Sequence, residues 1–570
     1  MALFIALFMI SLSLADSYDI GTPTVVNLYV NETTGSDSNS GTSSSSPFRT
    51  ITAAWNQIPR GSPLSVGYKI NLLSAEHTLM PHYWEERYGT FNHPIIISGS
   101  GNTVLTGDMN VYDVRYLYVT DLTIRPGGDA FHCEKCDHVL LKNVTLDGGS
   151  GAHETLKVNQ SQYFYIENSD IGGAGDNAVD FVAVQYGHIR NTKIHDAGDW
   201  CLYLKGGSSY FTVEGNRIYN CGTGGFTAGQ GTGFEFMTSP WLHYEAYDLK
   251  FINNLVYDTE GACFGVNGGY NILIAHNSCA RVGSRSHVAE VVFGLRSCDG
   301  DASACESRRL LGGWGINTIG DPGVQPIPNR NVFIYNNLII NQTASAWQHL
   351  AIYGPRTPHA SSNIPSPART DTNLLIKGNI IWNGSSSHPL GVEDSSEGCR
   401  NDSCNETQLR ADNHINTFEP DVVDLNSNDL RPLSGLLGIT GVVIPSFPGG
   451  DRVLAPLAPV GDLTNLVLKD RSGQSRGSTR VIGAYSSTDA PLDQVSPSIT
   501  RARCIVRNGR FTYKVKASHP SGISRVQVGQ KLLTLRGDLY KRTLRKRRGF
   551  ATAYSVDGGS ARRRVSFIYR

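Results

Sequence analysis

The sequence predicts an all-β protein, a right-handed parallel β-helix solenoid followed by a small C-terminal β-sandwich of immunoglobulin-like type. Its 570 residues include 61 glycines and only 5 methionines, a composition typical of turn-rich β structure. Short aliphatic and aromatic segments alternate with Gly, Asp and Asn turns between residues 163 and 233. Asparagines mark the repeat at Asn168, Asn191 and Asn216, which are 23 and 25 residues apart. This period, with no helix between the strands, predicts stacked coils.

The asparagine pattern continues over most of the chain. The asparagines that follow it are Asn143, Asn168, Asn191, Asn216, Asn254, Asn277, Asn337 and Asn379. The longer intervals predict insertions at residues 230–248, 295–330 and 354–372. Insertions in a solenoid form loops at the side of a coil, where they often wall a cleft.

The two ends of the chain differ from the repeat. An apolar run from Ala2 to Leu14 is too short to cross a bilayer and ends in a small-residue cleavage pattern, so residues 1–15 are predicted to be a signal peptide. The solenoid is expected over residues 16–488, with a capping helix from about Pro47 to Gln57. The sandwich is expected over residues 489–570.

Secretion and glycosylation are expected from the same features. The Asn-x-Ser/Thr sequons are Asn31, Asn143, Asn159, Asn341, Asn383, Asn401 and Asn405. Residues 501–570 hold 19 Lys and Arg but only Asp538 and Asp557 as acids, so this region should bind polyanions. Without a nucleic-acid-binding motif, an acidic polysaccharide is the expected partner, and nucleic acid is not. No transmembrane segment is expected, and the protein is expected to be a monomer.

Eleven cysteines suit a secreted chain with disulfides. The close pairs Cys298/Cys305 and Cys399/Cys404 predict local disulfides. Cys133 and Cys136 predict a turn disulfide or two buried thiols rather than a metal site.

Three sequence features carry a family resemblance. They are GSDSNSGT with PFRTI near the N-terminus, the Asn-marked turns, and LKGGSSYFTVEGNRIYNC. Together they resemble the secreted right-handed parallel β-helix proteins of the pectate-lyase-like superfamily over roughly residues 25–490. The resemblance implies a fold shared by polysaccharide lyases, hydrolases, epimerases and non-catalytic adhesins. YLKGGSSYFTVEGN is similar to the base-bearing strand of some alginate and chondroitin lyases, but Gln230 stands where those enzymes carry an arginine.

The spacing of the repeat predicts columns of outward side chains. Lys157, Val182, Lys205 and Gln230 follow the 25- and 23-residue intervals and are expected in one column. Asp180 and Tyr203 are expected in the column two residues earlier. Leu156, Phe181 and Leu204 should then point into the core. The adjoining Gly206 and Gly207 are expected to let a substrate approach the backbone closely.

This set of side chains suits β-elimination on a uronic acid. Lys205 is the predicted base, Tyr203 the acid or an alternative base, and Asp180 completes the catalytic group. Lys157 and Gln230 are predicted to bind the substrate, with Lys157 neutralising its carboxylate. Asp176 and Asp199 are predicted to hold Ca²⁺, which prefers carboxylate oxygens. Two alternatives remain open: solvated salt bridges with no function, and a retaining glycoside hydrolase that uses the aspartates.

The first insertion brings aromatic residues near this face. Trp241 and His243 are predicted to contact sugar rings. The alternative is a loop held by its own hydrophobic cluster. Together, these patterns predict a secreted polysaccharide lyase acting on an acidic, uronate-containing glycan. The alternatives are a non-catalytic glycan-binding or cell-surface protein and a β-helix glycoside hydrolase.

Overall fold

The computed structural model describes most of the chain. The described residues are 17–79, 83–125, 128–320, 323–344, 347–385, 387–393, 405–449, 458–489, 498–507, 510–518, 523–528, 531–536, 539–544, 550–555, 560–564 and 566–569. The predicted signal peptide, Cys399 and Cys404 lie outside them. Among the described residues, no helix combines the length and apolarity needed to cross a membrane. The chain divides into two compact units, residues 1–421 with 432–488 and residues 422–431 with 489–570.

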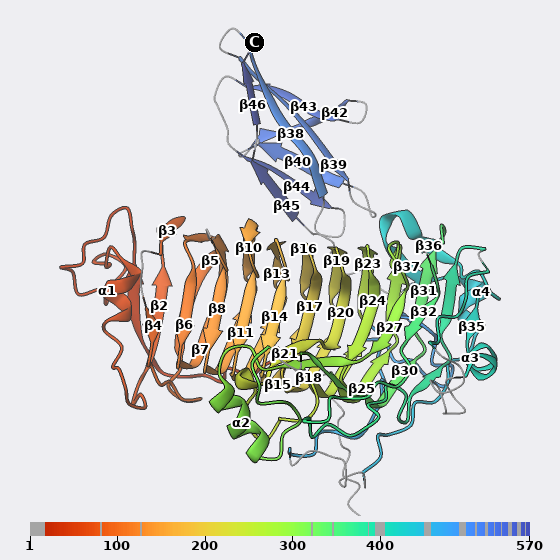
Figure 1. The fold of residues 1–570 in the computed structure, drawn as a ribbon. Coiled ribbons are helices and arrows are strands. Elements are labelled where there is room, and N and C mark those ends of the chain that lie inside the picture. Colours follow the sequence, from red (N-terminus) through yellow and green to blue (C-terminus); the bar gives the residue numbers. More distant parts are fainter. Residues whose placement is uncertain are drawn as a thin grey trace, which may run out of the picture. The chain divides into compact units, whose positions relative to one another are not determined.

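Stacked parallel strands form the solenoid, and each typical coil adds one strand to each of three stacks (Figure 1). The first stack is a ten-stranded sheet and carries the candidate site. Its strands are β4 (Trp84–Glu85), β6 (Met109–Tyr112), β8 (Phe131–Glu134), β11 (Leu156–Asn159), β14 (Val179–Val182), β17 (Trp200–Lys205), β20 (Gly224–Gly229), β24 (Ala262–Asn267), β27 (Ala289–Val292) and β32 (Leu350–Ile352).

The second and third stacks share the long strands β5 and β7 and so form one sheet of 22 described strands. The second stack runs through β1 (Val25–Val30), β2 (Gly67–Leu72), β5 (Ile95–Thr106), β7 (Arg115–Arg125), β9 (Asp137–Lys142), β12 (Gln162–Glu167), β15 (Gln185–Arg190), β18 (Ser208–Glu214), β22 (Ala246–Ile252), β25 (Gly269–Ala275), β30 (Arg330–Tyr335) and β33 (Leu375–Lys377). The third adds β3 (Glu76–Thr78), β10 (Thr145–Ala152), β13 (Asp170–Ala174), β16 (Lys193–Ala197), β19 (Arg217–Cys221), β23 (Leu255–Thr259), β26 (Ser278–Ala280), β31 (Leu338–Asn341), β34 (Ile380–Asn383) and β35 (His414–Ile415).

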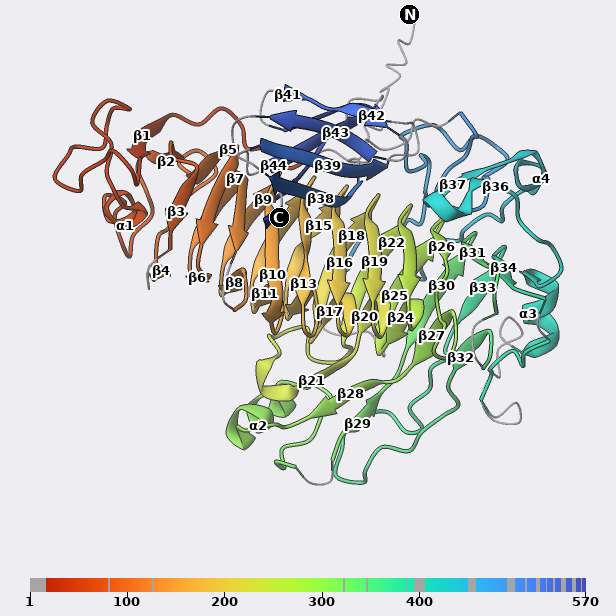
Figure 2. The ribbon, with the colours of Figure 1, turned by 90° about the horizontal axis from the view of Figure 1, so that it is seen from above.

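Insertions and short helices decorate this frame. The insertion beside the ten-stranded sheet contains β21 (Gly231–Gly233), η1 (Phe234–Phe236), β28 (Gly294–Ser297), α2 (Ala302–Leu310) and β29 (Gln325–Ile327). Seen from above, these elements project from one side of the solenoid (Figure 2). The remaining short elements of the C-terminal half are α3 (Glu406–Asp412), β36 (Val422–Asp424), η2 (Leu425–Ser427), β37 (Asp429–Pro432) and α4 (Ser434–Leu437).

The N-terminal helix is shorter than the sequence predicted. Helix α1 spans Ile51–Trp55 and begins where the Thr50 side chain accepts a hydrogen bond from the Ala53 amide at 3.1 Å. Ile51, Ala54 and Trp55 are buried, with Trp55 only 1% exposed. The helix lies at the N-terminal end of the solenoid, where an uncovered coil would expose unpaired strand edges (Figure 1).

The core confirms the predicted inward face. Leu156, Phe181 and Leu204 are all completely buried. Backbone register pairs Val158 with Phe181 and Phe181 with Leu204, so these three side chains stack from coil to coil, whereas Leu156 pairs with Val179.

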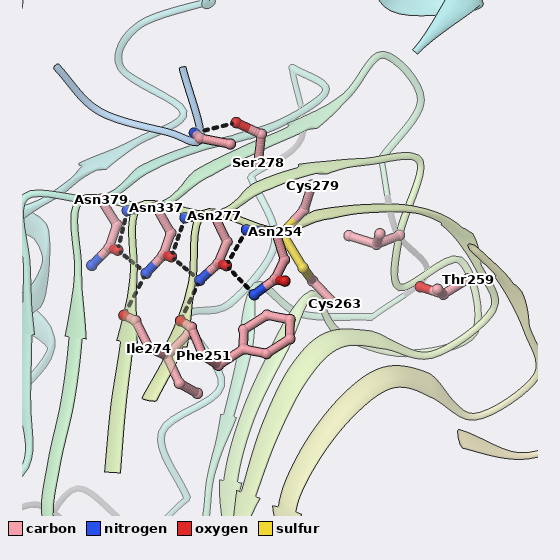
Figure 3. Close-up of a disulfide and its surroundings, with 12 residues drawn as sticks. Phe251, Asn254, Thr259, Cys263, Ile274, Asn277, Ser278, Cys279, Asn337 and Asn379 are labelled. Carbon is pink, nitrogen blue, oxygen red and sulfur yellow. Dashed lines mark hydrogen bonds between the residues drawn. A yellow bond between two sulfur atoms is a disulfide. The ribbon is translucent and has the colours of Figure 1, made fainter. Parts of the chain in front are cut away.

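A ladder of buried asparagines joins successive coils, but its register differs from the prediction at one end. The ladder consists of Asn216, Asn254, Asn277, Asn337, Asn379 and Asn413, linked side chain to side chain at 2.8–3.0 Å. Figure 3 shows the central part of this ladder. Asn143, Asn168 and Asn191 are exposed and adopt positive φ angles one residue earlier in the turn, so they are not ladder members. Hydroxyl groups of Ser169 and Thr192 take the inward position in those coils.

Two of the predicted glycosylation sites are buried. Asn341 and Asn383 form a separate step in the interior, with Nδ2 of Asn341 donating to Oδ1 of Asn383 at 3.0 Å. Their side chains are therefore inaccessible to a glycosyltransferase in the folded protein.

The described cysteines confirm two predicted disulfides and add two more. Cys298–Cys305 and Cys133–Cys136 are local disulfides. Cys201–Cys221 and Cys263–Cys279 instead connect strands of different stacks inside one coil. Figure 3 places Cys263–Cys279 in the interior beside the asparagine ladder.

The second unit contains two mostly antiparallel sheets. One is built from β38 (Ser498–Arg507), β39 (Arg510–Ser518), β42 (Thr534–Arg536), β43 (Leu539–Leu544) and β46 (Ser566–Tyr569), and the other from β40 (Ile523–Val528), β41 (Lys531–Leu532), β44 (Phe550–Ser555) and β45 (Ser560–Arg564). An immunoglobulin-like sandwich packing of these sheets stays a prediction.

We expect Asn277→Ala to destabilise the protein by about 2–4 kcal/mol. The change leaves the Asn254 amide, the Phe251 carbonyl and two ladder side chains short of partners, and each lost buried hydrogen bond costs about 1–3 kcal/mol. Urea unfolding measures this difference. The matched control is Asn168→Gly, because Asn168 is exposed and glycine tolerates its φ of 51°. Equal losses for both variants would contradict the revised register.

We expect His195 in β16 to make the protein less stable as the pH rises into the alkaline range. Its ring contacts Asp170 at 2.7 Å and Asp196 at 2.9 Å. Burial opposes the imidazolium, but these carboxylates outweigh burial and raise the pKa of His195 to about 9. The stabilisation, on the order of 3 kcal/mol, is fully present below about pH 6.5 and is lost as the pH rises through about 9.

Thermal midpoints of the wild type and His195→Gln between about pH 6 and pH 10 test this dependence. The gap between the two proteins should narrow as the pH rises. A gap that stays constant across this range would contradict the assigned role of His195.

Candidate active site

Polar side chains form columns on the outer face of the ten-stranded sheet. Backbone register pairs Lys157 with Asp180 and Asp180 with Tyr203, so these three side chains form one column. The same register pairs Val182 with Lys205 and places Lys205 in the next column. Neighbouring coils lie about 4.8 Å apart, so side chains of one column can interact directly.

Lys157 is two residues away from its predicted place in the register. Asp147 pairs with Gly172, 25 residues later, whereas Ala152 pairs with Ala174, only 22 residues later. This irregularity in β10 accommodates the extra residues of the coil before β11 begins. The 25-residue interval therefore applies only to residues before this irregularity. Lys157 lies after it and pairs with Asp180, 23 residues later.

Lys157 is held by two buried carboxylates. Its Nζ lies 2.9 Å from Oε1 of Glu154 and 3.0 Å from Oδ2 of Asp180. Burial disfavours the ammonium, but Asp180 and Glu154 outweigh that effect and raise the pKa of Lys157. The ammonium is thus already neutralised by the protein and is not available as predicted for a substrate carboxylate.

Lys205 has neutral partners instead. Its Nζ donates to the Tyr203 hydroxyl and to Oε1 of Gln230, both at 3.2 Å, and lies 4.2 Å from the centre of the Tyr203 ring. No ion pair of Lys205 occurs within the described residues, and its side chain is half-buried. The structure thus brings together the predicted Lys205, Tyr203 and Gln230, although register places Gln230 one residue beyond the partner of Lys205.

Tyr203 and Asp180 lie on the predicted face but are covered by their neighbours. Tyr203 is 4% exposed and Asp180 1% exposed. The Tyr203 hydroxyl also accepts a hydrogen bond from Nδ2 of Asn177 at 2.9 Å. Burial, reinforced by the charge of Asp180, raises the pKa of Tyr203. The phenol therefore stays protonated at neutral pH, which favours an acid over a base.

The acidic residues at the start of the strands form a mixed cluster. His153 contacts Oε2 of Glu154 at 2.7 Å and Oδ2 of Asp176 at 3.3 Å. One ligand atom of each of these three residues lies within 4.8 Å of the others. Burial and the nearby Asp199 raise the pKa of the Asp176 carboxyl. Asp176 thus joins His153 and Glu154, with Asp199 one coil further on.

A buried ion pair attaches the insertion to the turn after Lys205. Arg296 donates to Oε1 of Glu245 through Nε at 2.9 Å and Nη2 at 2.6 Å, and both side chains are fully buried. The other oxygen, Oε2, accepts from the Gly206 amide at 3.0 Å and from the Thr232 hydroxyl at 2.7 Å. Glu245 therefore joins the loop to the residue that follows Lys205.

The glycine pair in this turn serves the loop rather than a substrate. A Cβ atom at Gly207 would lie 2.4 Å from the Trp241 carbonyl oxygen, and Gly206 is buried as well. Both glycines adopt positive φ angles. The predicted approach of a substrate to this backbone is therefore wrong, because the insertion occupies the space.

Trp241 and His243 do not face the polar columns. Trp241 is 5% exposed, and its Nε1 donates to the Tyr210 hydroxyl at 3.0 Å. His243 packs edge-on against Trp314, and burial with the Arg296 charge lowers the pKa of His243 to about 4. Trp241 thus belongs to the loop's own hydrophobic cluster, and contact of Trp241 or His243 with a sugar ring stays a prediction.

Glu154, His153 and Asn177 belong to the site but were not predicted from the sequence. Glu154 lies three residues before Lys157. Within one strand, residues three apart point to opposite faces, so the two side chains can meet only because strand β11 begins between them. No repeat pattern marked that boundary. The carboxylate of Glu154, three residues before Lys157, was the available signal.

We expect Glu245→Gln to destabilise the protein by about 3–5 kcal/mol, because it leaves the buried Arg296 charge without a counter-charge. Unfolding free energies of the full chain measure the loss. Adding Arg296→Met should recover a large part of it. The control Glu393→Gln removes half of an exposed ion pair with Arg356 and should change stability by less than about 1 kcal/mol. Additive losses in the double variant would contradict a coupled pair.

Comparisons with known proteins support the fold. A family model described as "Right handed beta helix region" matches residues 127–285. Probable pectin lyase A of Aspergillus terreus is 24% identical over 184 residues, which cover 32% of this chain and 41% of the relative. Probable pectin lyase D of Aspergillus flavus is 26% identical over 214 residues, covering 37% of this chain and 49% of the relative. The chain thus spans less than half the length of these curated relatives.

Among solved structures, pectate lyase Pel9A superposes with a TM-score of 0.42 at 13% identity, covering 82% of this chain and 98% of that one. The family match coincides with the coils from β8 to β26, whose parallel strands stack in register. The chain therefore contains a right-handed parallel β-helix, which the family model matches over residues 127–285.

Proposed function

We propose that this protein is a polysaccharide lyase that cleaves an acidic, uronate-containing glycan by β-elimination at the face around Lys205. The observation that carries the proposal is the difference between the two lysines of this face. Lys157 is neutralised by Glu154 and Asp180, whereas Lys205 is half-exposed and, among the described residues, binds the neutral groups of Tyr203 and Gln230. Lys205 is thus the lysine of this face whose amine is left to take a proton from a substrate.

The proposed reaction needs a base and an acid. The Lys205 amine takes the proton on the carbon α to the carboxyl group. The electron pair of that C–H bond forms a C=C bond, and the bond from the neighbouring carbon to the glycosidic oxygen breaks. The leaving oxygen then takes a proton, which Tyr203 is the proposed residue to supply because its phenol stays protonated. Asp180 is a positioning residue in this proposal, because its carboxylate holds Lys157 and places a negative charge beside Tyr203.

A cation is also required to stabilise the charge that develops on the substrate carboxylate. Lys157 is engaged, so Ca²⁺ is proposed for this role. The donor set fits a hard cation in part: Asp176 and Asp199 offer carboxylate oxygens, while His153 offers a nitrogen that Ca²⁺ does not favour. When bound, Ca²⁺ would neutralise the substrate carboxylate.

The names of the relatives agree with this reaction class, since they are pectin lyases. Secretion is part of the proposal, because the predicted leader agrees with four disulfides of the kind formed in oxidising compartments. A monomeric state stays a prediction.

We expect Lys205→Met to abolish turnover while the thermal midpoint changes little, because Lys205 makes only neutral contacts at the surface. Its matched control is Lys157→Met, which leaves Glu154 and Asp180 buried without a counter-charge and should cost about 3–5 kcal/mol. Activity is measured on acidic glycans by ultraviolet absorbance of the unsaturated product and by reducing ends. Full activity of Lys205→Met would place the site elsewhere.

The same assay separates the alternatives. Reducing ends without new absorbance would indicate a hydrolase, and neither signal on a broad panel of acidic glycans would indicate a binding protein.

We expect chelation with EDTA to lower the activity, and added Ca²⁺ to restore it. Asp176→Asn should raise the Ca²⁺ concentration needed for half-maximal activity at least about tenfold, because it removes one carboxylate charge from the proposed ligands. Asp258→Asn, at an exposed ion pair with Arg281, is the control. Unchanged activity in EDTA would remove Ca²⁺ from the proposal without affecting the role of Lys205.

A further inference from the structure

A groove with a volume of about 490 Å³ lies at the corner between the ten-stranded sheet and the second stack. Its volume lies in the range of small-molecule binding sites. Tyr88, Arg115, Lys135, Gln160 and Gln162 are among its lining residues. None of these residues belongs to the cluster around Lys205.

The lining repeats from coil to coil. Lys135 and Gln160 stand at the same turn position of successive coils, with positive φ angles of 55° and 46°. Arg115 pairs with Asp137, and Asp137 pairs with Gln162, at the start of the second stack. Equivalent groups therefore recur about every 4.8 Å along the solenoid axis. A linear polymer lying along the axis would meet a polar side chain at each coil.

The polar groups of the groove balance one another in charge. Arg115 lies 3.6 Å from Oδ1 of Asp113, and Asp137 pairs with His138. Lys135 donates to the Tyr112 hydroxyl at 2.8 Å. These pairings leave little net charge to attract a polyanion.

The amides of the groove favour hydroxyl groups. Each glutamine carries both a donor and an acceptor, as a sugar hydroxyl does. Nε2 of Gln162 donates weakly to Gln185 at 3.4 Å, and Nε2 of Gln160 donates to the Phe236 carbonyl at 3.1 Å. Among the described residues, no hydrogen bond is made to the side-chain oxygen of either glutamine. The composition of the groove thus suits a neutral, hydroxyl-rich ligand.

Aromatic rings border the groove. The Tyr88 ring lines the groove and lies 4.3 Å from the Arg115 guanidinium. Tyr112 and Phe236, which are 38% and 50% exposed, contact the lining residues Lys135 and Gln160. Exposed rings next to hydrogen-bonding groups are suited to the apolar faces of sugar rings.

The walls of the groove are rigid. The Cys133–Cys136 disulfide closes the turn that carries Lys135. Such a short loop removes little entropy from the unfolded chain, so the bond mainly fixes local geometry. The ring of the lining residue Tyr116 stacks on His138, and His138 stacks on Tyr163, with centres 4.2 Å apart in each pair. A preformed site loses little conformational freedom on binding.

We propose that this corner groove is a second carbohydrate-binding site, and that it holds an uncharged, hydroxyl-rich polysaccharide segment along the solenoid axis. The inference does not depend on the proposed reaction at Lys205. A glycan with both neutral and acidic stretches could therefore engage both surfaces.

Calorimetric titration of the full chain tests the proposal. The neutral probes are cellohexaose, xylohexaose and mannohexaose, and hexagalacturonate is the acidic probe. At least one neutral probe should bind, with an affinity that changes little with salt. Gln160→Ala combined with Gln162→Ala should weaken that binding at least about tenfold, since it removes two hydrogen-bonding side chains. Gln408→Ala in α3 is the matched control and should bind like the wild type.

Three results would overturn the proposal. They are no binding of any neutral probe at millimolar concentration, undiminished binding by the double variant, and binding of only the acidic probe with steep salt dependence. If the double variant unfolds, the exposed Arg115→Ala replaces it with the same expected direction. Any activity at the Lys205 face should be unaltered in these variants on short acidic oligosaccharides, which separates this proposal from the proposed function.

Discussion

The buried asparagine ladder is the constraint on which the stacking of the later coils depends. The amide of each ladder residue before Asn413 accepts a hydrogen bond from the backbone of the previous coil and donates both to a carbonyl and to the next ladder residue, as Asn277 and Asn337 show. The turn between the second and third stacks leaves backbone groups in the interior, where an unmade hydrogen bond costs about 1–3 kcal/mol. Satisfying them with one amide per coil fixes the register of that turn. Once the turn is fixed, the columns on the ten-stranded sheet are fixed as well.

The columns explain how two lysines of one face acquire different chemistry. Lys157 lies near the start of its strand, where it contacts Glu154 of the same coil, and it contacts Asp180 of the next coil. Lys205 stands in the neighbouring column, where the adjacent coils offer Val182 and a glycine, and its polar contacts come from Tyr203 and Gln230. Two carboxylates thus hold the Lys157 ammonium within the protein, whereas Lys205 is left with uncharged hydrogen-bonding partners.

Much of this architecture could be predicted from the sequence, because a period-two apolar pattern and a fixed repeat length specify an inward face. Leu156, Phe181 and Leu204 follow from that pattern alone. The register could not be predicted in two places. Extra residues can enter a coil at any turn, and only the structure shows that they precede Lys157. Asparagine is also favourable at the exposed turn position with left-handed backbone, so in the sequence Asn168 could not be told apart from a buried ladder residue.

The burial of Tyr203 and Trp241 could not be predicted from the sequence either. Periodicity assigns a side chain to a face of the sheet but does not say which residues cover it, and Trp200 and Ala262 pack against Tyr203. Trp241 lies in the insertion, where residues far apart in the chain meet, as Glu245 and Arg296 do beside the pairing of β21 with β28. A buried ion pair is weakly stabilising compared with apolar packing, so its retention points to a specific placement. Here the pair fixes the Gly206 amide and, through it, the end of strand β17 that carries Lys205.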